Sequence, residues 1–131
     1  MNAPRPLSPH LGVYKFMYTM SLSILHRITG LAAAFGFLAL VWWLMALATG
    51  PDAYARAMQC LGTPLSKLLL VGFTFSFVYH FCNGIRHLVW DTGRGLERAQ
   101  ARRSGALVVV AALLGTALVV WLGCRAMGAA P

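Results

Sequence analysis

The sequence predicts an all-helical integral membrane protein with three membrane-spanning helices, and three observations carry this prediction. Apolar residues make up 59% of the 131 residues and charged residues only 11%, against roughly a quarter charged in soluble globular proteins. The mean hydropathy is +0.68. Three long runs contain no charged residue, and a helix needs about 20 such residues to cross the hydrocarbon core of a bilayer. We treat 1–131 as a single membrane domain.

The uncharged runs set the positions of the predicted helices. The runs are 28–51, 68–85 and 104–124. The second is short, but Lys67 and Arg86 at its ends could extend their charged groups to the membrane surface and so lengthen the span. Lipid cannot satisfy unpaired backbone groups, so each run should be helical. With flanking residues, the predicted helices are 23–49, 65–91 and 103–125. The connection from Pro51 to Pro64 should carry a short amphipathic turn at 54–60.

The distribution of cations predicts the orientation of the chain. Only Arg56, Lys67 and Arg125 flank the side of the first connection and the C-terminus. The other eight of the 11 Lys and Arg residues lie on the opposite side: Arg5, Lys15, Arg27, Arg86, Arg94, Arg98, Arg102 and Arg103. Because cytoplasmic loops carry the excess of Lys and Arg, the N-terminus should be cytoplasmic and the C-terminus periplasmic. No Arg- and Ser-rich transit sequence is evident, so we expect a multi-pass protein of a bacterial inner membrane.

Several other classes of protein fit the sequence poorly. A net charge of +8 could indicate nucleic-acid binding, but the basic residues lie between apolar runs and not along one water-exposed face. The three cysteines form no CxxC pair, which argues against a zinc site or a c-type haem. A small transporter usually shows repeats and broken helices, and neither is evident.

The first polar cluster lies at the start of the first predicted helix. At 100° per residue, Ser23, Arg27, Gly30 and Ala34 share one face. A hydroxyl and a guanidinium on one face suit a carbonyl oxygen or a carboxylate, and the small residues would let a helix or flat ligand approach. In an alternative interpretation, Arg27 binds a lipid phosphate and Ser23 helps to start the helix. The residues alone leave both open.

The second polar cluster lies at the end of the second predicted helix. His80, Gly84, His87 and Asp91 follow at i, i+4, i+7 and i+11, which makes one continuous stripe. Gly84 leaves space in which a flat macrocycle could fit. His80 should lie about 16 Å deeper in the membrane than Asp91. A buried imidazole at that depth needs a partner, either a haem iron or a hydrogen bond to a neighbouring helix. Arg86 falls on another face and could reach the membrane surface or bind an anionic group there.

The third run carries no charged residue. Its sequence is Ala-, Leu-, Val- and Gly-rich with a single Thr116. We expect it to serve in packing, through small residues such as Ala111 and Gly115.

Taken together, the two clusters resemble a known family. The matching segments are Arg5-Pro6-Leu7-Ser8-Pro9-His10, the S-x-x-H-R-x-T-G motif from Ser23 to Gly30, and the H-x-x-x-G-x-R-H-x-x-x-D motif from His80 to Asp91. In this order, on the first two of three spans, they resemble the cytochrome b-type membrane anchor, the C subunit, of succinate dehydrogenase (respiratory complex II).

The resemblance implies a role for each of the singled-out residues. It implies that His80 is an axial ligand of a haem b iron, and that Ser23 and Arg27 lie at the ubiquinone head group. It places His26, Arg27 and His87 near the haem propionates and implies a structural role for Asp91. The second haem ligand would come from a separate small anchor subunit, so the three helices would form part of a heterodimeric bundle.

The resemblance also implies partners and a place in metabolism. An iron–sulfur subunit and a flavoprotein subunit would dock on the cytoplasmic face, and electrons from succinate would reach ubiquinone in electron transport linked to the tricarboxylic acid cycle. The chain shows no flavin fingerprint and no cysteine cluster, so we expect no succinate chemistry and no catalytic residue in it. Alternatives are the anchor of a quinol:fumarate reductase and a haemless structural anchor. A self-contained di-haem cytochrome is disfavoured, because His10 precedes the membrane.

Overall fold

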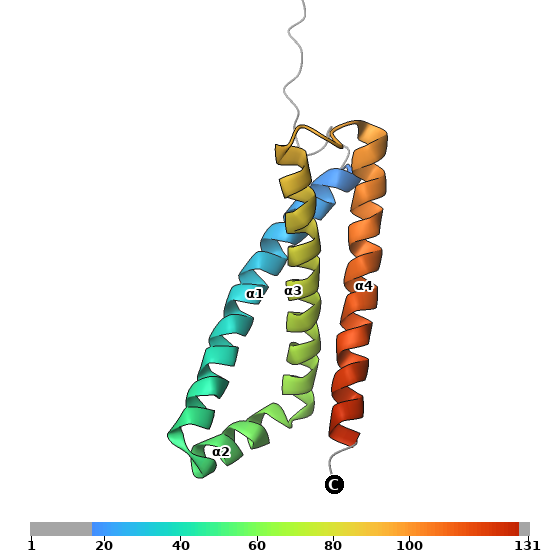
Figure 1. The fold of residues 1–131 in the computed structure, drawn as a ribbon. Coiled ribbons are helices and arrows are strands. Elements are labelled where there is room, and N and C mark those ends of the chain that lie inside the picture. Colours follow the sequence, from blue (N-terminus) through green and yellow to red (C-terminus); the bar gives the residue numbers. More distant parts are fainter. Residues whose placement is uncertain (1–16, 129–131) are drawn as a thin grey trace, which may run out of the picture.

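The computed structural model describes residues 17–128, which contain four helices and no strand (Figure 1). The helices are α1 (Tyr18–Thr49), α2 (Pro51–Leu61), α3 (Pro64–Asp91) and α4 (Arg98–Gly128). Helices α1, α3 and α4 are long and apolar enough to cross a membrane. The predicted all-helical class with three spans is confirmed. The Arg5–His10 segment lies outside the described residues.

The helices extend beyond the apolar runs that predicted them. Helix α1 begins at Tyr18 and α4 at Arg98, each five residues before its predicted start. Hydropathy marks only the part of a helix inside hydrocarbon, whereas backbone hydrogen bonding continues through the interface, where aromatic and basic residues are favoured. The predicted amphipathic turn is the full helix α2, with Pro51 in its first turn beside Asp52, residues that suit a helix N-terminus.

Glycines and one threonine make the connections between helices. Gly50 has φ of 133° and separates α1 from α2. Thr63 caps α3, and its side-chain oxygen accepts a hydrogen bond from the backbone N–H of Ser66 at 3.3 Å. Gly93 and Gly95 have φ of 77° and 75° in the turn between α3 and α4. These positive φ values are adopted at little cost only by glycine.

Helix α3 lies between α1 and α4 (Figure 1). Helix α1 crosses α4 near its own first turns, where Leu22 and Tyr18 lie against Gly105, and then diverges from α4 towards α2. Farther along, the ring of Phe73 on α3 packs against Gly36 on α1. The start of α1 and the α3–α4 turn lie at one end of the bundle, and α2 and the end of α4 lie at the other.

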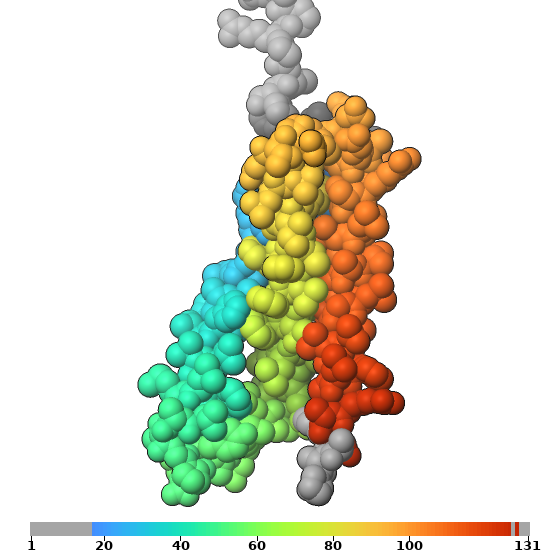
Figure 2. Space-filling view, in the orientation of Figure 1, coloured from blue at the N-terminus to red at the C-terminus, as the bar shows by residue number. Residues whose placement is uncertain are grey.

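Large apolar side chains cover the outside of the bundle, and polar side chains share its interior with small and apolar ones. The buried residues of α3 are Ser76, Tyr79, Asn83 and Arg86. The body is elongated (Figure 2). Large apolar side chains are exposed along it; Leu107 and Leu68, for example, are 70% and 68% exposed. Apolar groups lose nothing when they face lipid, so small and hydrogen-bonded residues can hold the helices together. The interior also contains an apolar cluster of Leu22, Tyr79, Val108 and Ala112. This pattern fits membrane insertion.

One expectation about packing was wrong, and a second is met inside this chain by only one of its two residues. Arg86 is only 6% exposed and does not extend to the membrane surface, because α4 covers its face of α3 and offers it hydrogen-bond acceptors. On α4, Ala111 is exposed whereas Ala112 is fully buried. A shift of one residue rotates a helix face by about 100°. Gly115 does pack as expected, since a Cβ there would lie 2.9 Å from Val78 Cγ1.

Candidate functional site

Three histidine side chains from two helices form a single cluster. His26 comes from α1, and His80 and His87 come from α3. The rings of His26 and His80 stack with centroids 4.0 Å apart and planes at 14°. The ring of His26 also lies 5.1 Å from that of His87, tilted by 36°. His26 therefore bridges the deep and the shallow histidine of the α3 stripe, a contact that the sequence did not predict.

A hydrogen bond fixes the donor nitrogen of His80. Its Nδ1 atom lies 3.0 Å from the backbone oxygen of His26. A carbonyl oxygen can only accept, so Nδ1 carries a hydrogen, and this is the tautomer in which Nε2 can offer a lone pair. Among the described residues, Nε2 has no hydrogen-bond partner. The ring thus presents a fixed, unused electron-pair donor.

Two glycines shape the surroundings of this ring. A Cβ at Gly30 would lie 2.8 Å from His80 Cε1, so the absence of a side chain on α1 lets the imidazole sit against the backbone. A Cβ at Gly84 would meet nothing within 4 Å. There is open space beside α3 between His80 and His87, as the spacing of the stripe predicted.

Ser23 and Arg27 lie one turn apart near the start of α1. Arg27 is exposed and Ser23 half-buried, and neither makes a hydrogen bond within the described part of the chain. Hydroxyls inside helices commonly donate to the carbonyl four residues earlier. Thr29 does so to Leu25 at 2.8 Å, and Thr116 to Ala112 at 2.7 Å. The hydroxyl of Ser23 is different, because it remains available to an external acceptor.

Polar atoms of the cluster also lack partners. Nε2 of His26 is buried and unpaired within residues 17–128. His87 makes ring contacts but no hydrogen bond there. Asp91 at the end of α3 is exposed and has no ion-pair partner in that part of the chain. The structure brings His26, His80 and His87 together, but it shows no contact of Asp91 with them.

Arg86 and Asn83 form a second polar group that the sequence interpretation missed. The Arg86 guanidinium donates to Ser104 Oγ at 3.0 Å, to Asn83 Oδ1 at 3.2 Å and to the Ala101 oxygen at 2.8 Å. Tyr79 on the same face donates its hydroxyl to the Leu22 oxygen on α1 at 3.0 Å. The sequence contained a signal for this group, because Tyr79, Asn83 and Arg86 form a second i, i+4, i+7 stripe that begins one residue before the histidine stripe. The hydrogen bonds of Tyr79 and Arg86 connect α3 to both neighbouring helices.

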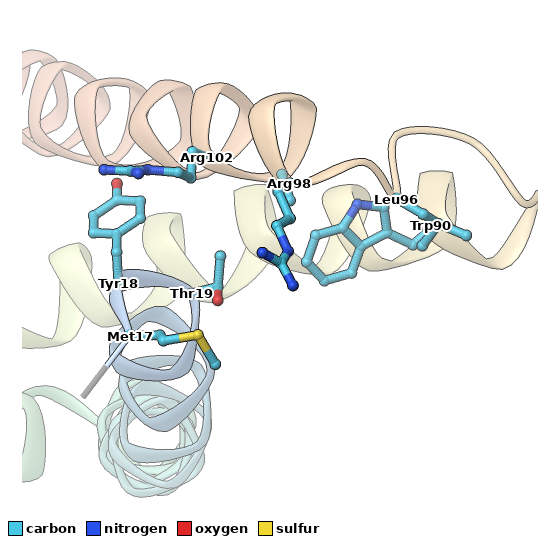
Figure 3. Close-up of a pocket in the computed structure, with 8 residues that line it drawn as sticks. Met17, Tyr18, Thr19, Trp90, Leu96, Arg98 and Arg102 are labelled. Carbon is cyan, nitrogen blue, oxygen red and sulfur yellow. The ribbon is translucent and has the colours of Figure 1, made fainter. Parts of the chain in front are cut away.

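A cavity of about 660 Å³ opens at the same end of the bundle (Figure 3). Its lining comes from the start of α1, the end of α3 and the start of α4: Met17, Tyr18, Thr19, Trp90, Leu96, Arg98, Ala101 and Arg102. None of the predicted site residues lines it. The histidine cluster itself does not line the cavity, but it adjoins it through Trp90, which lines the cavity and contacts the ring of His87.

Comparison with known proteins agrees with this architecture. Residues 1–119 match the sequence profile of the succinate dehydrogenase/fumarate reductase transmembrane subunit family. The chain belongs to that family. The matched part contains both polar motifs and all of α1 and α3, so the resemblance inferred from the motifs is confirmed.

Individual relatives of this succinate dehydrogenase/fumarate reductase subunit come from bacteria and from mitochondria. The chain is 44% identical over 118 residues to the succinate dehydrogenase cytochrome b556 subunit of Rickettsia prowazekii, covering 90% of this chain and 91% of the relative. It is 39% identical over 110 residues to the subunit of that name from Paracoccus denitrificans, covering 84% and 85%. It is 37% identical over 118 residues to the mitochondrial cytochrome b560 subunit of Homo sapiens, covering 88% and 70%.

Proposed function

We propose that this chain is the haem b- and quinone-binding anchor of a succinate:quinone oxidoreductase in a bacterial inner membrane. A flavoprotein subunit would oxidise succinate and an iron–sulfur subunit would carry the electrons to the membrane. A second small anchor subunit would complete a heterodimeric helical bundle. Near the start of α1, beside Ser23 and Arg27, ubiquinone would take up two electrons and two protons to become ubiquinol. This chain supplies binding groups and no succinate chemistry.

The observation that carries the proposal is the hydrogen bond from His80 Nδ1 to the His26 oxygen at 3.0 Å. Histidines that bind metals almost always donate their other ring N–H to an acceptor of this kind, which fixes the tautomer and the ring orientation. The remaining Nε2 lone pair of His80 is the group that would hold the haem iron, and the open space beside Gly84 suits a flat macrocycle. When bound, haem b supplies a one-electron redox centre.

The other members of the cluster suit the carboxylates of a haem. Arg27 is a permanent cation, and His26 and His87 are ring N–H donors without partners among the described residues. Hydrogen bonds from charged or N–H donors to a carboxylate are strong where water is excluded. His26, Arg27 and His87 would therefore face the propionates, and the second axial ligand would come from the second anchor subunit.

Ser23 and Arg27 would bind the quinone head group. Both present unused donors at the membrane edge, where a lipid-soluble quinone can enter and where electrons from a docked subunit would arrive. Their donors would hold a quinone carbonyl oxygen and stabilise the negative charge that develops on it during reduction. This role needs the start of α1 on the cytoplasmic side, which the excess of Lys and Arg at that end favours.

The proposal is tested by replacing His80 with Asn in the complete complex. An asparagine amide can reproduce a donor near the Nδ1 position, so His80→Asn can keep a hydrogen bond to the His26 oxygen while it removes the Nε2 lone pair. We expect the reduced-minus-oxidised spectrum of the purified complex to lose or change its b-type absorbance. A haemless anchor needs only the hydrogen bond, and its complex would assemble and work unchanged.

His87→Asn is the matched control for this experiment. It removes an imidazole from the same cluster and leaves the proposed axial ligand in place. Because the asparagine amide can still donate a hydrogen bond to a propionate, this variant should keep the b-type absorbance. Loss of haem in His87→Asn, together with an unchanged spectrum in His80→Asn, would show that the wrong histidine has been assigned. Complete haem binding by the isolated chain would contradict a second ligand from a partner.

A further inference from the structure

Trp90 joins the histidine cluster to the α3–α4 turn. Its ring meets the ring of His87 edge-on, with centroids 5.1 Å apart and planes at 86°. The guanidinium carbon of Arg86 lies 3.9 Å from the centre of the Trp90 ring. The indole N–H donates to the backbone oxygen of Gly95 at 3.0 Å. One half-buried side chain thus contacts members of both polar stripes of α3 and the turn that follows.

His87 depends on ring contacts for its orientation. Within residues 17–128 its imidazole makes no hydrogen bond and no ion pair. It contacts two rings, those of His26 and Trp90. His26 is itself held by stacking on His80. Of these two rings, only that of Trp90 belongs to a residue outside the histidine cluster.

Trp90 is itself held from two sides. Arg86 is anchored to Asn83 and to α4 by its three hydrogen bonds, so the cation over the indole has a fixed position. Gly95 lies against the other part of the ring, since a Cβ there would be 3.6 Å from both Cδ1 and Nε1 of Trp90. With φ of 75°, Gly95 brings its carbonyl to the indole N–H in a conformation that other residues rarely adopt.

We propose that Trp90 is a positioning residue that sets the orientation of the His87 imidazole. The indole transmits the fixed geometry of Arg86 and of the α3–α4 turn to the shallow end of the histidine cluster. The contacts of Trp90 are made by residues of this chain alone and do not depend on a ligand. The consequence for electron transfer rests on the proposed function, in which His87 faces the haem propionates.

The test compares Trp90→Leu and Trp90→Phe in the complete complex. Phe keeps a ring against His87 and Arg86 but loses the bond to Gly95, whereas Leu loses both. Trp121→Leu is the matched control, because Trp121 makes the same kind of cation–π contact, with Arg125 at 4.7 Å, at the other end of the bundle. The direct measurement is the His87 side-chain conformation in cryo-EM maps of each variant. The functional measurement is quinone-linked activity divided by dye-linked activity.

We expect His87 to change rotamer or lose ring density in Trp90→Leu, to stay close to its wild-type position in Trp90→Phe, and to be unchanged in Trp121→Leu. The activity ratio should fall about two- to tenfold in Trp90→Leu, the range that a single aromatic contact supports, and less in Trp90→Phe. An unmoved His87 in Trp90→Leu would overturn the proposal, as would equal displacement in both Trp90 variants. A displaced His87 with an unchanged ratio would support the positioning and contradict the role proposed for His87.

Discussion

At the scale of single residues, the site depends on which polar atoms make hydrogen bonds within the chain and which remain available to a ligand. The sequence left two partners open for His80, a haem iron or a hydrogen bond to a neighbouring helix, and the hydrogen bond is present. It uses only Nδ1, so it leaves Nε2 available for the iron that the proposed function places there. Ser23 and Arg27, by contrast, have no internal partner among the described residues. Unused donors of this kind are the groups that a substrate can bind.

Substitution of Arg27 and Ser23 tests the quinone pocket. A hydrogen bond from a charged donor contributes about 1.5–3 kcal/mol, so Arg27→Ala should lower quinone reductase efficiency about ten- to a hundredfold. Ser23→Ala should lower it less, because its hydroxyl is a neutral donor. The measurement is quinone-linked over dye-linked succinate oxidation in membranes with matched complex content. Dye-linked activity should survive in both variants. An unchanged ratio in both would contradict the quinone role and favour the alternative in which Arg27 binds a lipid phosphate.

At the scale of helices, α3 is organised by two stripes that face different neighbours. The stripe of His80, Gly84 and His87 faces α1 and open space. The stripe that contains Asn83 and Arg86 faces α4. In lipid there is little hydrophobic force between helices, so hydrogen bonds and close backbone approach hold them together. Helix α4 therefore contributes to the site indirectly, by fixing the rotation of α3 through Arg86.

Arg86→Lys tests this role of the guanidinium. Lysine keeps the charge but cannot reproduce the planar fork that reaches Ser104, Asn83 and Ala101 together. Loss of one charged hydrogen bond should destabilise the packing of α3 on α4 by about 1.5–3 kcal/mol, seen as a lower unfolding temperature of the purified complex. Arg103→Lys makes the same chemical change on the exposed surface of α4 and should have little effect. Equal unfolding temperatures for the two variants would contradict the structural importance of the fork.

At the scale of the whole molecule, the two ends of the bundle differ in composition. The end with the start of α1 and the α3–α4 turn carries most of the arginines and the histidine cluster, and the other end carries α2. Burial of Arg86 removes one cation from the surface at the first end, but the excess there remains large. The proposed quinone site would then lie at the end of the bundle on which soluble subunits would dock.

Reporter fusions test this orientation. A reporter that is active only in the periplasm should be active when fused at Gly62 or at the C-terminus and inactive at Gly95. A cytoplasmic reporter at the same three positions should give the complementary pattern. This outcome follows from the asymmetry in Lys and Arg. Periplasmic activity at Gly95 would contradict the assigned orientation, and the proposed docking side would then have to be exchanged.

The sequence by itself determined the class of the protein, the number of spans, the family and most of the candidate site residues. Hydropathy and motif spacing are properties of the linear sequence. Because backbone exposed to lipid must be helical, an apolar run in the sequence directly predicts a membrane-spanning helix. Contacts between helices are different, because they depend on crossing and on rotation, where one residue changes the face by about 100°. Only the tertiary structure decided that Arg86 is buried, that Ala112 packs in place of Ala111, and that His26 contacts both other histidines. The hydrogen bond between His80 and the His26 oxygen joins residues 54 positions apart, and it exists because Gly30 lets α1 and α3 approach closely at that point.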